Sequence, residues 1–159
     1  MRSENQLNHY KEQKYMELKW NDIPDGWALC YNKECINREK CLHWHAGQLN
    51  TQEQTIVRCV MPYALKNGIC PHFASTEMVT YARGFSKIYD QVLKTDYTPL
   101  RKEMTTMLSG KRYYYEYMRG ERRLSPEQQE KIRDLFAKYG YADSVHFDSF
   151  EQDYDFKEI

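Results

Sequence analysis

The residues most able to do chemistry in this 159-residue chain are its five cysteines, all of which lie in the N-terminal half. Four of them, Cys30, Cys35, Cys41 and Cys70, have the spacing C-x4-C-x5-C-x28-C, and a proline follows the last. Thiolates that converge from separate loops bind zinc tetrahedrally and also hold iron–sulfur clusters. We therefore predict a metal site made of these four thiolates, with zinc as the metal and an iron–sulfur cluster as the alternative.

Other roles for the cysteines remain open at this point. Inert buried thiols and redox groups are the alternatives to metal ligands. Cys59 lies in the apolar stretch IVRCVMPYAL, so we expect it in the core. His43, His45 and His72 lie close to Cys41 or Cys70 and are candidates for a mixed site, although hydrogen bonding beside the ligands is their commoner role.

A second chemically promising segment, GKRYYYEYMRGERR, combines basic residues with four tyrosines. Guanidinium groups bind phosphates bidentately, and tyrosine stacks on bases or donates to phosphate oxygens. The mixture predicts contact with DNA or RNA, with another protein as the alternative partner and a solvated helix face as the simplest interpretation. The predicted nucleic-acid-binding residues are Lys111, Arg112, Tyr113, Tyr115, Arg119, Arg122 and Arg123.

The sequence contains no recognisable catalytic motif. G-x-S-x-G, P-loop, G-x-G-x-x-G and H-E-x-x-H patterns are all absent. A Cys–His hydrolase would have to use cysteines and histidines that are near neighbours in sequence, whereas the nucleophile and base of such enzymes normally come from separate parts of the fold. We predict no catalytic residues and no enzymatic activity.

The character of the chain changes along its length. Residues 1–19 are polar and predict a flexible arm, whereas residues 20–75 are punctuated by Pro and Gly and predict a loop-rich region that a metal would staple. Residues 76–140 show helical periodicity, and residues 141–159 form an acidic, aromatic tail with a short strand at most. The predicted fold is mainly α, with the cysteine-containing region packed on a small helical bundle.

Four helices are expected in the helical region. The first carries an apolar stripe from Met78 to Val92, and the second begins at Thr98, which precedes a proline. The third spans Arg112–Met118. The fourth begins with a capping box at Ser125 and ends at Gly140.

The formal net charge is zero, but the charges are unevenly distributed. Residues 1–97 carry 12 basic and 11 acidic groups, residues 98–139 carry 10 and 6, and residues 140–159 carry 1 and 6. Only the middle block suits an anionic partner. No apolar run resembles a signal peptide or is long enough for a bilayer, so we expect a cytoplasmic protein without a membrane partner. Cytosolic cysteines are seldom in structural disulfides.

The C-terminal part resembles lambda-repressor-like helix-turn-helix domains. In that family a short recognition helix ends in an Arg-Gly pair, a basic dipeptide follows, and a Ser-capped helix begins. By position, residues 85–93, 100–108, 112–118 and 126–139 would be the successive helices. The resemblance implies a core-facing side made of Tyr114 and Tyr117 and a groove-facing side made of Arg112, Tyr113, Tyr115 and Glu116.

The segments WALCYNKECINREKCLHW, CPHF and YTPLRKEMTTMLSGKRYYYEYMRGERRLSPEQQEKIRDLFAKYGY, in this order, resemble an uncharacterised family of small four-cysteine proteins from anaerobic gut bacteria, a domain of unknown function. The resemblance spans residues 20–148 and implies that Cys59 is incidental to the family's cysteine set. Together, the observations predict a metal-stabilised regulatory or binding protein that contacts nucleic acid. The alternative is a protein-interaction adaptor with a structural metal or none, and the oligomeric state is left open.

Overall fold

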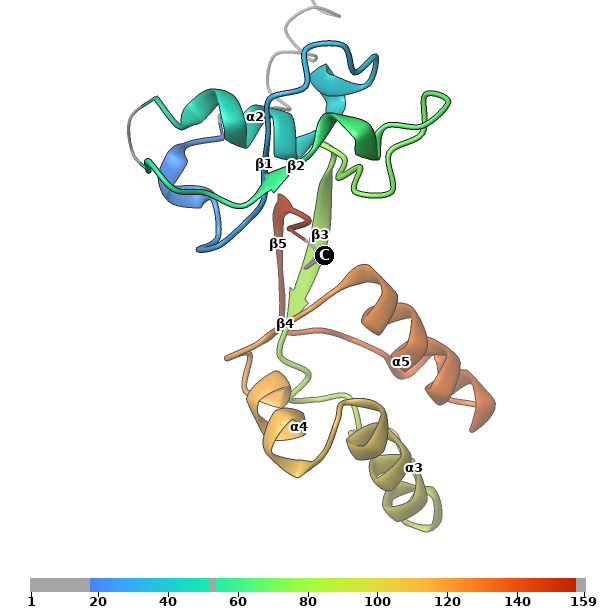
Figure 1. Cartoon of the computed structure of the whole chain (residues 1–159). Coiled ribbons are helices and arrows are strands. Elements are labelled where there is room, and N and C mark those ends of the chain that lie inside the picture. The colour runs from blue at the N-terminus through green and yellow to red at the C-terminus, as the bar shows by residue number, and fades with distance from the viewer. Residues whose placement is uncertain (1–17, 52–53, 157–159) are drawn as a thin grey trace, which may run out of the picture. The chain divides into compact units, whose positions relative to one another are not determined.

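The computed structural model describes residues 18–51 and 54–156, which form two compact units. Unit 1 comprises the described residues up to Thr76 together with Phe156, and unit 2 comprises Glu77–Asp155 (Figure 1). Residues 1–17, which make up most of the predicted flexible arm, lie outside the described residues. No helix in residues 18–51 and 54–156 is both long and apolar enough to cross a membrane.

Unit 1 is built from short elements joined by loops. Strands β1 (Leu29–Cys30) and β2 (Cys59–Val60) pair in parallel, and helix α2 (Leu42–Leu49) packs against β1. Three 3-10 helices of one turn lie in the connections: η1 (Trp20–Asp22), η2 (Arg38–Lys40) and η3 (Pro62–Ala64).

The core of unit 1 depends on a close approach between α2 and β1. Leu29, Leu42 and Ala46 are almost fully buried there. A Cβ atom placed on Gly47 would lie 2.3 Å from the carbonyl oxygen of Cys30, so only glycine fits at this point of the helix. Because glycine has no side chain, α2 can lie directly on β1 at this position.

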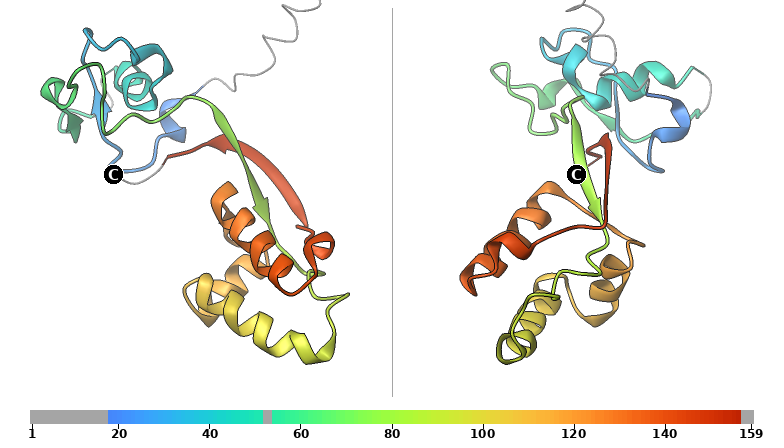
Figure 2. Two further views of the ribbon diagram at one scale, coloured as in Figure 1. Left: turned by 90° about the vertical axis from the view of Figure 1, so that its right-hand side faces the viewer. Right: turned by 180° about the vertical axis from the view of Figure 1, so that it is seen from behind.

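Unit 2 contains a three-stranded antiparallel sheet with the strand order β4-β3-β5. The central strand β3 (Met78–Arg83) pairs along its whole length with β5 (Ser149–Tyr154), and its end pairs with the short β4 (Arg123–Leu124). Figure 2 shows β3 and β5 running together. The helices of unit 2 are α3 (Lys94–Met107), α4 (Lys111–Met118), α5 (Pro126–Lys138) and the single-turn η4 (Ala142–Ser144).

One face of this sheet belongs to the core. Ala82 and Leu124 are paired across β3 and β4, and both are fully buried. The amide of Gln129 in α5 donates to the carbonyl oxygens of Thr80 and Leu124, which fastens the helix to the two strands. The remaining buried members of the core come from the helices and the β3–α3 connection: Phe85, Ile88, Leu100, Met104, Leu108, Tyr114, Ile132 and Phe136.

The two helices with the clearest local signals are confirmed. The backbone N–H of Gln128 donates to the Ser125 hydroxyl (3.2 Å), and the Gln128 side-chain oxygen accepts from the Ser125 N–H (3.0 Å). This capping box begins α5, and Gly140 follows the helix with φ 85°. Helix α4 is also confirmed, one residue longer than predicted at its start.

The predicted mainly α fold is wrong, because the chain is a mixture of helices and two sheets. The apolar stripe that begins at Met78 starts as strand β3, and residues 85–93 form turns instead of the expected first helix. Val79, Thr80 and Tyr81 are β-branched or aromatic residues with high strand propensity. Their pairing with β5 outweighs the helical spacing of the apolar residues.

Two smaller predictions have mixed outcomes. Helix α3 begins at Lys94 and not at Thr98, and Pro99 lies inside it, where its missing N–H removes one bond of the helical ladder. The acidic tail was expected to hold a short strand at most. The tail is more ordered than that, because it contains both η4 and the six-residue strand β5, whose acidic side chains find cationic partners in the same sheet.

The tight contact at Gly47 generates a stability prediction. Gly→Ala in a helix normally stabilises by about 1 kcal/mol, but Gly47→Ala should destabilise unit 1 by about 1–3 kcal/mol, because the methyl group overpacks the contact with Cys30. All three tryptophans belong to unit 1, so urea unfolding followed by tryptophan fluorescence reports on this unit. Gln48→Ala, an exposed position in the same helix, is the control and should be neutral or slightly stabilising. An increase in stability for Gly47→Ala would contradict the prediction.

Candidate nucleic-acid interface

Of the five cysteines, Cys59 is the one whose predicted place differs from the structure. All five are free thiols, and Cys59 is exposed on β2 instead of buried in the core. The pKa of the Cys30 thiol is raised, mainly by burial, with smaller effects from the thiols of Cys41, Cys59 and Cys35. Cys59 lies beside Cys30 in the parallel pair of β1 and β2, where Leu29 pairs with Cys59 and Cys30 pairs with Val60. Within residues 18–51 and 54–156, no group of three or more Cys, His, Asp or Glu side chains is placed to hold a metal ion. The site of Cys30, Cys35, Cys41 and Cys70 stays a prediction.

His43, one of the histidines near the cysteines, has a structural environment. Its ring stacks on Trp27 at 4.4 Å with an interplanar angle of 5°, and its Nδ1 lies 2.5 Å from the carbonyl oxygen of Ala28. Since a carbonyl only accepts, Nδ1 is the donor. Burial lowers the pKa of His43, which favours the neutral ring. These contacts hold His43 in the core of unit 1.

The arginines predicted to contact nucleic acid are engaged within unit 2. Glu116 of α4 receives Nε–H bonds from both Arg112 (2.9 Å) and Arg122, and its side chain is only 16% exposed. Arg119 binds Glu121 through two nitrogens. The hydrogen bonds from Arg122 and then Arg112 lower the pKa of Glu116, so its carboxylate stays charged. Two carboxylates therefore bind three of the predicted arginines, which leaves one net positive charge in this part of the predicted interface.

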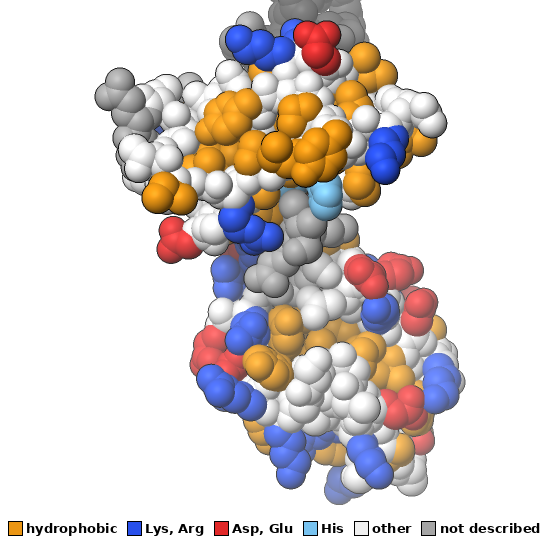
Figure 3. Space-filling view, in the orientation of Figure 1, with side chains coloured by type: hydrophobic (Ala, Val, Ile, Leu, Met, Phe, Trp, Pro, Cys, Tyr) orange, Lys and Arg blue, Asp and Glu red, His pale blue; other side chains and the backbone are white. Residues whose placement is uncertain are grey.

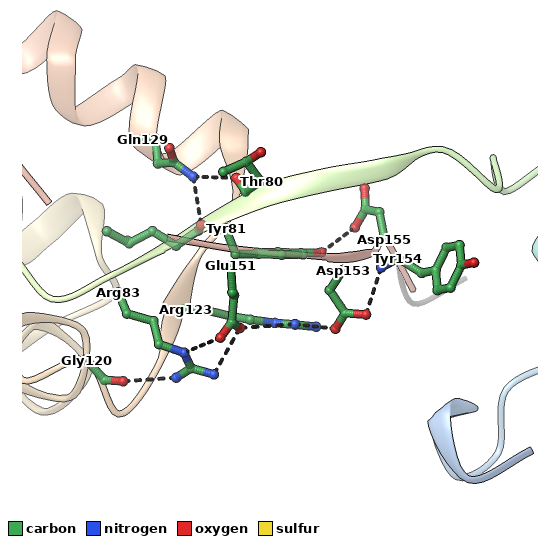
Figure 4. Close-up of polar contacts among 11 residues, drawn as sticks. Thr80, Tyr81, Arg83, Gly120, Arg123, Gln129, Glu151, Asp153, Tyr154 and Asp155 are labelled. Atoms are coloured by element: carbon green, nitrogen blue, oxygen red, sulfur yellow. Dashed lines mark hydrogen bonds and ion pairs between the residues drawn. The ribbon is translucent and has the colours of Figure 1, made fainter. Parts of the chain in front are cut away.

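Arg123 belongs to a charged network on the face of the sheet opposite the core (Figure 4). Its guanidinium lies 4.0 Å from the centre of the Tyr81 ring and donates to Asp153 (2.5 Å). Arg83 on the neighbouring strand binds Glu151 through two nitrogens, at 2.9 and 3.1 Å. Burial, together with the hydrogen bond to Asp155, raises the pKa of Tyr81 to about 12. The network ties β4, β3 and β5 together.

Ion pairing leaves a specific set of cations unneutralised. Residues 98–139, all of which are described, contain ten Lys and Arg residues. Seven of the ten pair with carboxylates: Arg112, Arg119, Arg122, Arg123, Lys131, Arg133 and Lys138. The other three are Arg101, Lys102 and Lys111, which have no ion pair with a carboxylate in the described part of the chain.

These three cations line the same cavity, which lies between α3 and α4 and has a volume of about 460 Å³. No acidic residue lines the cavity. The rest of the lining consists of hydroxyl-bearing residues, namely the tyrosines Tyr97, Tyr114 and Tyr115 and the threonines Thr98, Thr105 and Thr106. The cavity therefore offers positive charge and hydrogen-bonding groups to an anionic ligand.

Arg101 is the best-positioned of the three cations. Its guanidinium carbon lies 5.6 to 5.9 Å from the ring centres of Tyr97, Tyr114 and Tyr115, and one of its nitrogens donates to the Tyr115 hydroxyl. Cations are attracted to aromatic faces at this range. The three rings and the Tyr115 hydroxyl hold the guanidinium in place, which leaves most of its N–H groups available for an anion.

The cavity combines predicted residues with residues that the sequence analysis missed. Lys111 and Tyr115 were predicted and lie in the lining, whereas Tyr113 was predicted and lies under Arg122, at 4.7 Å from its guanidinium. Arg101 and Lys102 were missed. The available signal was the spacing of Tyr97, Arg101 and Thr105, which fall four residues apart on one face of α3.

Comparison with protein-family models finds a match to a family of unknown function, DUF6078, over residues 9–156. The chain belongs to the DUF6078 family. The predicted resemblance to an uncharacterised domain is confirmed in this form. Comparison of the DUF6078 chain with curated proteins and with solved structures finds no match.

The predicted cysteine site leads to a test of metal content in the DUF6078 protein. The sequence predicts about one zinc, or one iron–sulfur cluster, per chain, held by several thiolates together. Elemental analysis and an absorption spectrum of protein purified without oxygen should detect it, and the Cys35→Ala, Cys41→Ala double variant should lose it. Cys59→Ala is the control and should retain the metal. Wild-type protein without metal, or loss of metal in the control, would contradict the predicted set.

The charged face of the DUF6078 sheet predicts a pH dependence of stability. The Arg83 hydrogen bonds, with help from Arg123, lower the pKa of Glu151 below its ordinary 4.5. The stabilisation is therefore present above about pH 4.5 and is lost as the pH falls through the folded-state pKa. We expect Glu151→Gln to lower the free energy of unfolding by about 1 kcal/mol at pH 7, since the pair is partly exposed, and by less at pH 3.

Urea unfolding followed by far-ultraviolet circular dichroism at both pH values measures this difference for Glu151→Gln. Glu130→Gln is the matched control, because Glu130 also pairs with an arginine but is 67% exposed in α5. It should change stability by less than about 0.5 kcal/mol. An effect of Glu151→Gln that is equally large at pH 3 and pH 7 would show that the ion pair is not its cause.

Proposed function

We propose that this protein binds nucleic acid through the cavity between α3 and α4 of unit 2. A single observation carries the proposal. Arg101, Lys102 and Lys111, the three cations of residues 98–139 without an ion pair to a carboxylate in the described part of the chain, all line one cavity that has no acidic residue in its lining. Phosphate groups are bound in proteins by Arg and Lys side chains and by hydroxyl groups, and the cavity supplies all three.

The proposal moves the expected contact away from the arginines of the predicted interface. Arg112 and Arg122 already bind Glu116, and a phosphate that replaced this carboxylate would have to break two charge-assisted hydrogen bonds. Lys102 and Lys111 require no such exchange, because both are exposed at the cavity. Their charges are therefore the ones that attract a phosphate backbone.

A protein-interaction adaptor is the second candidate function, and an observation on unit 1 favours it. Ile36, Tyr63 and Ile69 are 79%, 74% and 73% exposed, respectively. Figure 3 shows hydrophobic side chains gathered on the visible face of this unit. Large exposed apolar patches commonly bind partners. Binding by apolar contact should depend little on moderate salt, whereas binding of nucleic acid should weaken steeply as counterions are added.

Salt dependence of oligonucleotide binding tests the first candidate. Fluorescence anisotropy with a labelled 20-nucleotide probe, repeated over a series of KCl concentrations, gives the slope of log affinity against log salt. Removing two phosphate contacts with Lys102→Ala, Lys111→Ala should lower affinity at all sequences and flatten the slope by roughly 1.5 to 2. Both side chains are exposed and unpaired in the described part of the chain, so the variant should keep its fold.

Lys131→Ala, Lys138→Ala is the matched control for this experiment. It removes the same amount of charge from unit 2, but both lysines lie on α5 and pair with Glu127 and Glu103. The slope should change by less than half as much as in the cavity variant. Equal effects in the two variants would mean that only net charge matters, and absence of binding by wild-type protein would refute the nucleic-acid function.

A further inference from the structure

The shape of the cavity restricts the kind of nucleic acid that it suits. Its volume of about 460 Å³ lies within the range of roughly 300–1,000 Å³ typical of pockets for single small ligands. Double-stranded DNA is normally read by an element that protrudes into a groove about 12 Å wide. A recess between two helices instead accepts a group that projects from the ligand, such as one nucleotide unit of an unpaired strand.

The outward side of α4 offers little to a duplex. Arg112 and Arg122 are held by the carboxylate of Glu116 between them, and Arg122 also covers the ring of Tyr113. The two arginines share one carboxylate that is only 16% exposed, so a duplex backbone that approached this side would meet one net positive charge. The unpaired cations lie instead in the recess between α3 and α4.

The cavity also has an aromatic surface for a base. Tyr97 is 37% exposed, and its ring packs edge-on against Tyr89 at 5.1 Å, which leaves the ring supported but accessible. The guanidinium of Arg101 lies 5.9 Å from the Tyr97 ring centre. Proteins that bind single strands combine positive grooves with aromatic side chains on which unpaired bases stack. Tyr97 and Arg101 provide both elements within one cavity.

Two hydroxyl groups of the cavity are already used as donors within α3. The hydroxyls of Thr105 and Thr106 donate to the carbonyl oxygens of Arg101 and Lys102, at 2.8 and 3.1 Å, so their remaining lone pairs act as acceptors. These acceptors can receive a hydrogen bond from a sugar hydroxyl of the ligand, so the donors that bind its phosphate are the side chains of the cations. The Tyr114 hydroxyl is likewise engaged, because it donates to the hydroxyl of Tyr89 at 3.3 Å.

We infer that this cavity binds one nucleotide of a single-stranded nucleic acid, with a phosphate on Arg101 and Lys111 and the base stacked on Tyr97. The inference rests on the proposed function and adds to it the class of ligand. Both single-stranded DNA and single-stranded RNA carry the required phosphate and base. The duplex lacks an unpaired base to insert, so its binding is limited to weaker contacts of its backbone with the lysines.

Anisotropy measurements on the full chain test the inference with three labelled probes of one sequence: single-stranded DNA, single-stranded RNA and the DNA duplex. Both single strands should bind at least about tenfold more tightly than the duplex at the same salt concentration. Tyr97→Leu, which keeps apolar packing on Tyr89 but loses the ring, should weaken single-strand binding by about tenfold. Tyr97→Phe should restore it, because the phenyl ring still stacks.

Tyr113→Leu is the control, since Tyr113 has a matching exposure of 38% in the same unit but does not line the cavity. It should leave single-strand affinity unchanged within about twofold. Equal affinity for duplex and single strands, or equal losses in Tyr97→Leu and Tyr113→Leu, would overturn the inference while leaving the proposed function in place. If no probe binds, or if Lys102→Ala, Lys111→Ala weakens the binding of none of them, the proposed function itself is refuted.

Discussion

The antiparallel pairing of β3 with β5 determines most of what unit 2 contains. Successive side chains in a strand point to opposite faces, so a shift of one residue in this register would exchange the two faces of the sheet. The observed register places Ala82 and Leu124 on the buried face and Glu151 and Asp153 beside arginines on the other. Helix α5 starts directly after β4 and is fastened by Gln129 to β3 and β4, so its position follows from the pairing of these two strands on the other edge of β3.

The same ion pairs in unit 2 both stabilise the fold and determine which cations remain available to a ligand. The carboxylates of the last strand and of α4 stabilise the fold by binding arginines, and they thereby withdraw those arginines from contact with an anionic ligand. The cations beside α3 are not matched in this way. Unmatched cations gathered in one cavity can direct an anion to that place.

The sequence was sufficient where the signal was local. The capping box at Ser125 and the glycine at 140 define α5 with neighbouring residues alone. Strand β3 was missed because its partner is far away in the chain, and the apolar positions of β3 and the turns after it happen to fall at helical intervals. The arginines of α4 were correctly seen as basic. Their pairing with Glu116 could not be foreseen for Arg122, which reaches it from the next turn of the chain.

The position of β5 has a consequence for the folding of newly made chains. Met78 pairs with Tyr154, so 76 residues must follow before the ladder can be completed. At about 5–20 residues per second, a ribosome adds them in roughly 4 to 15 s. During this interval β3 is a strand without its main partner, and such edges invite pairing with other chains. Arg83, whose charge is neutralised only when Glu151 arrives, gives the nascent edge a positive charge that opposes such association.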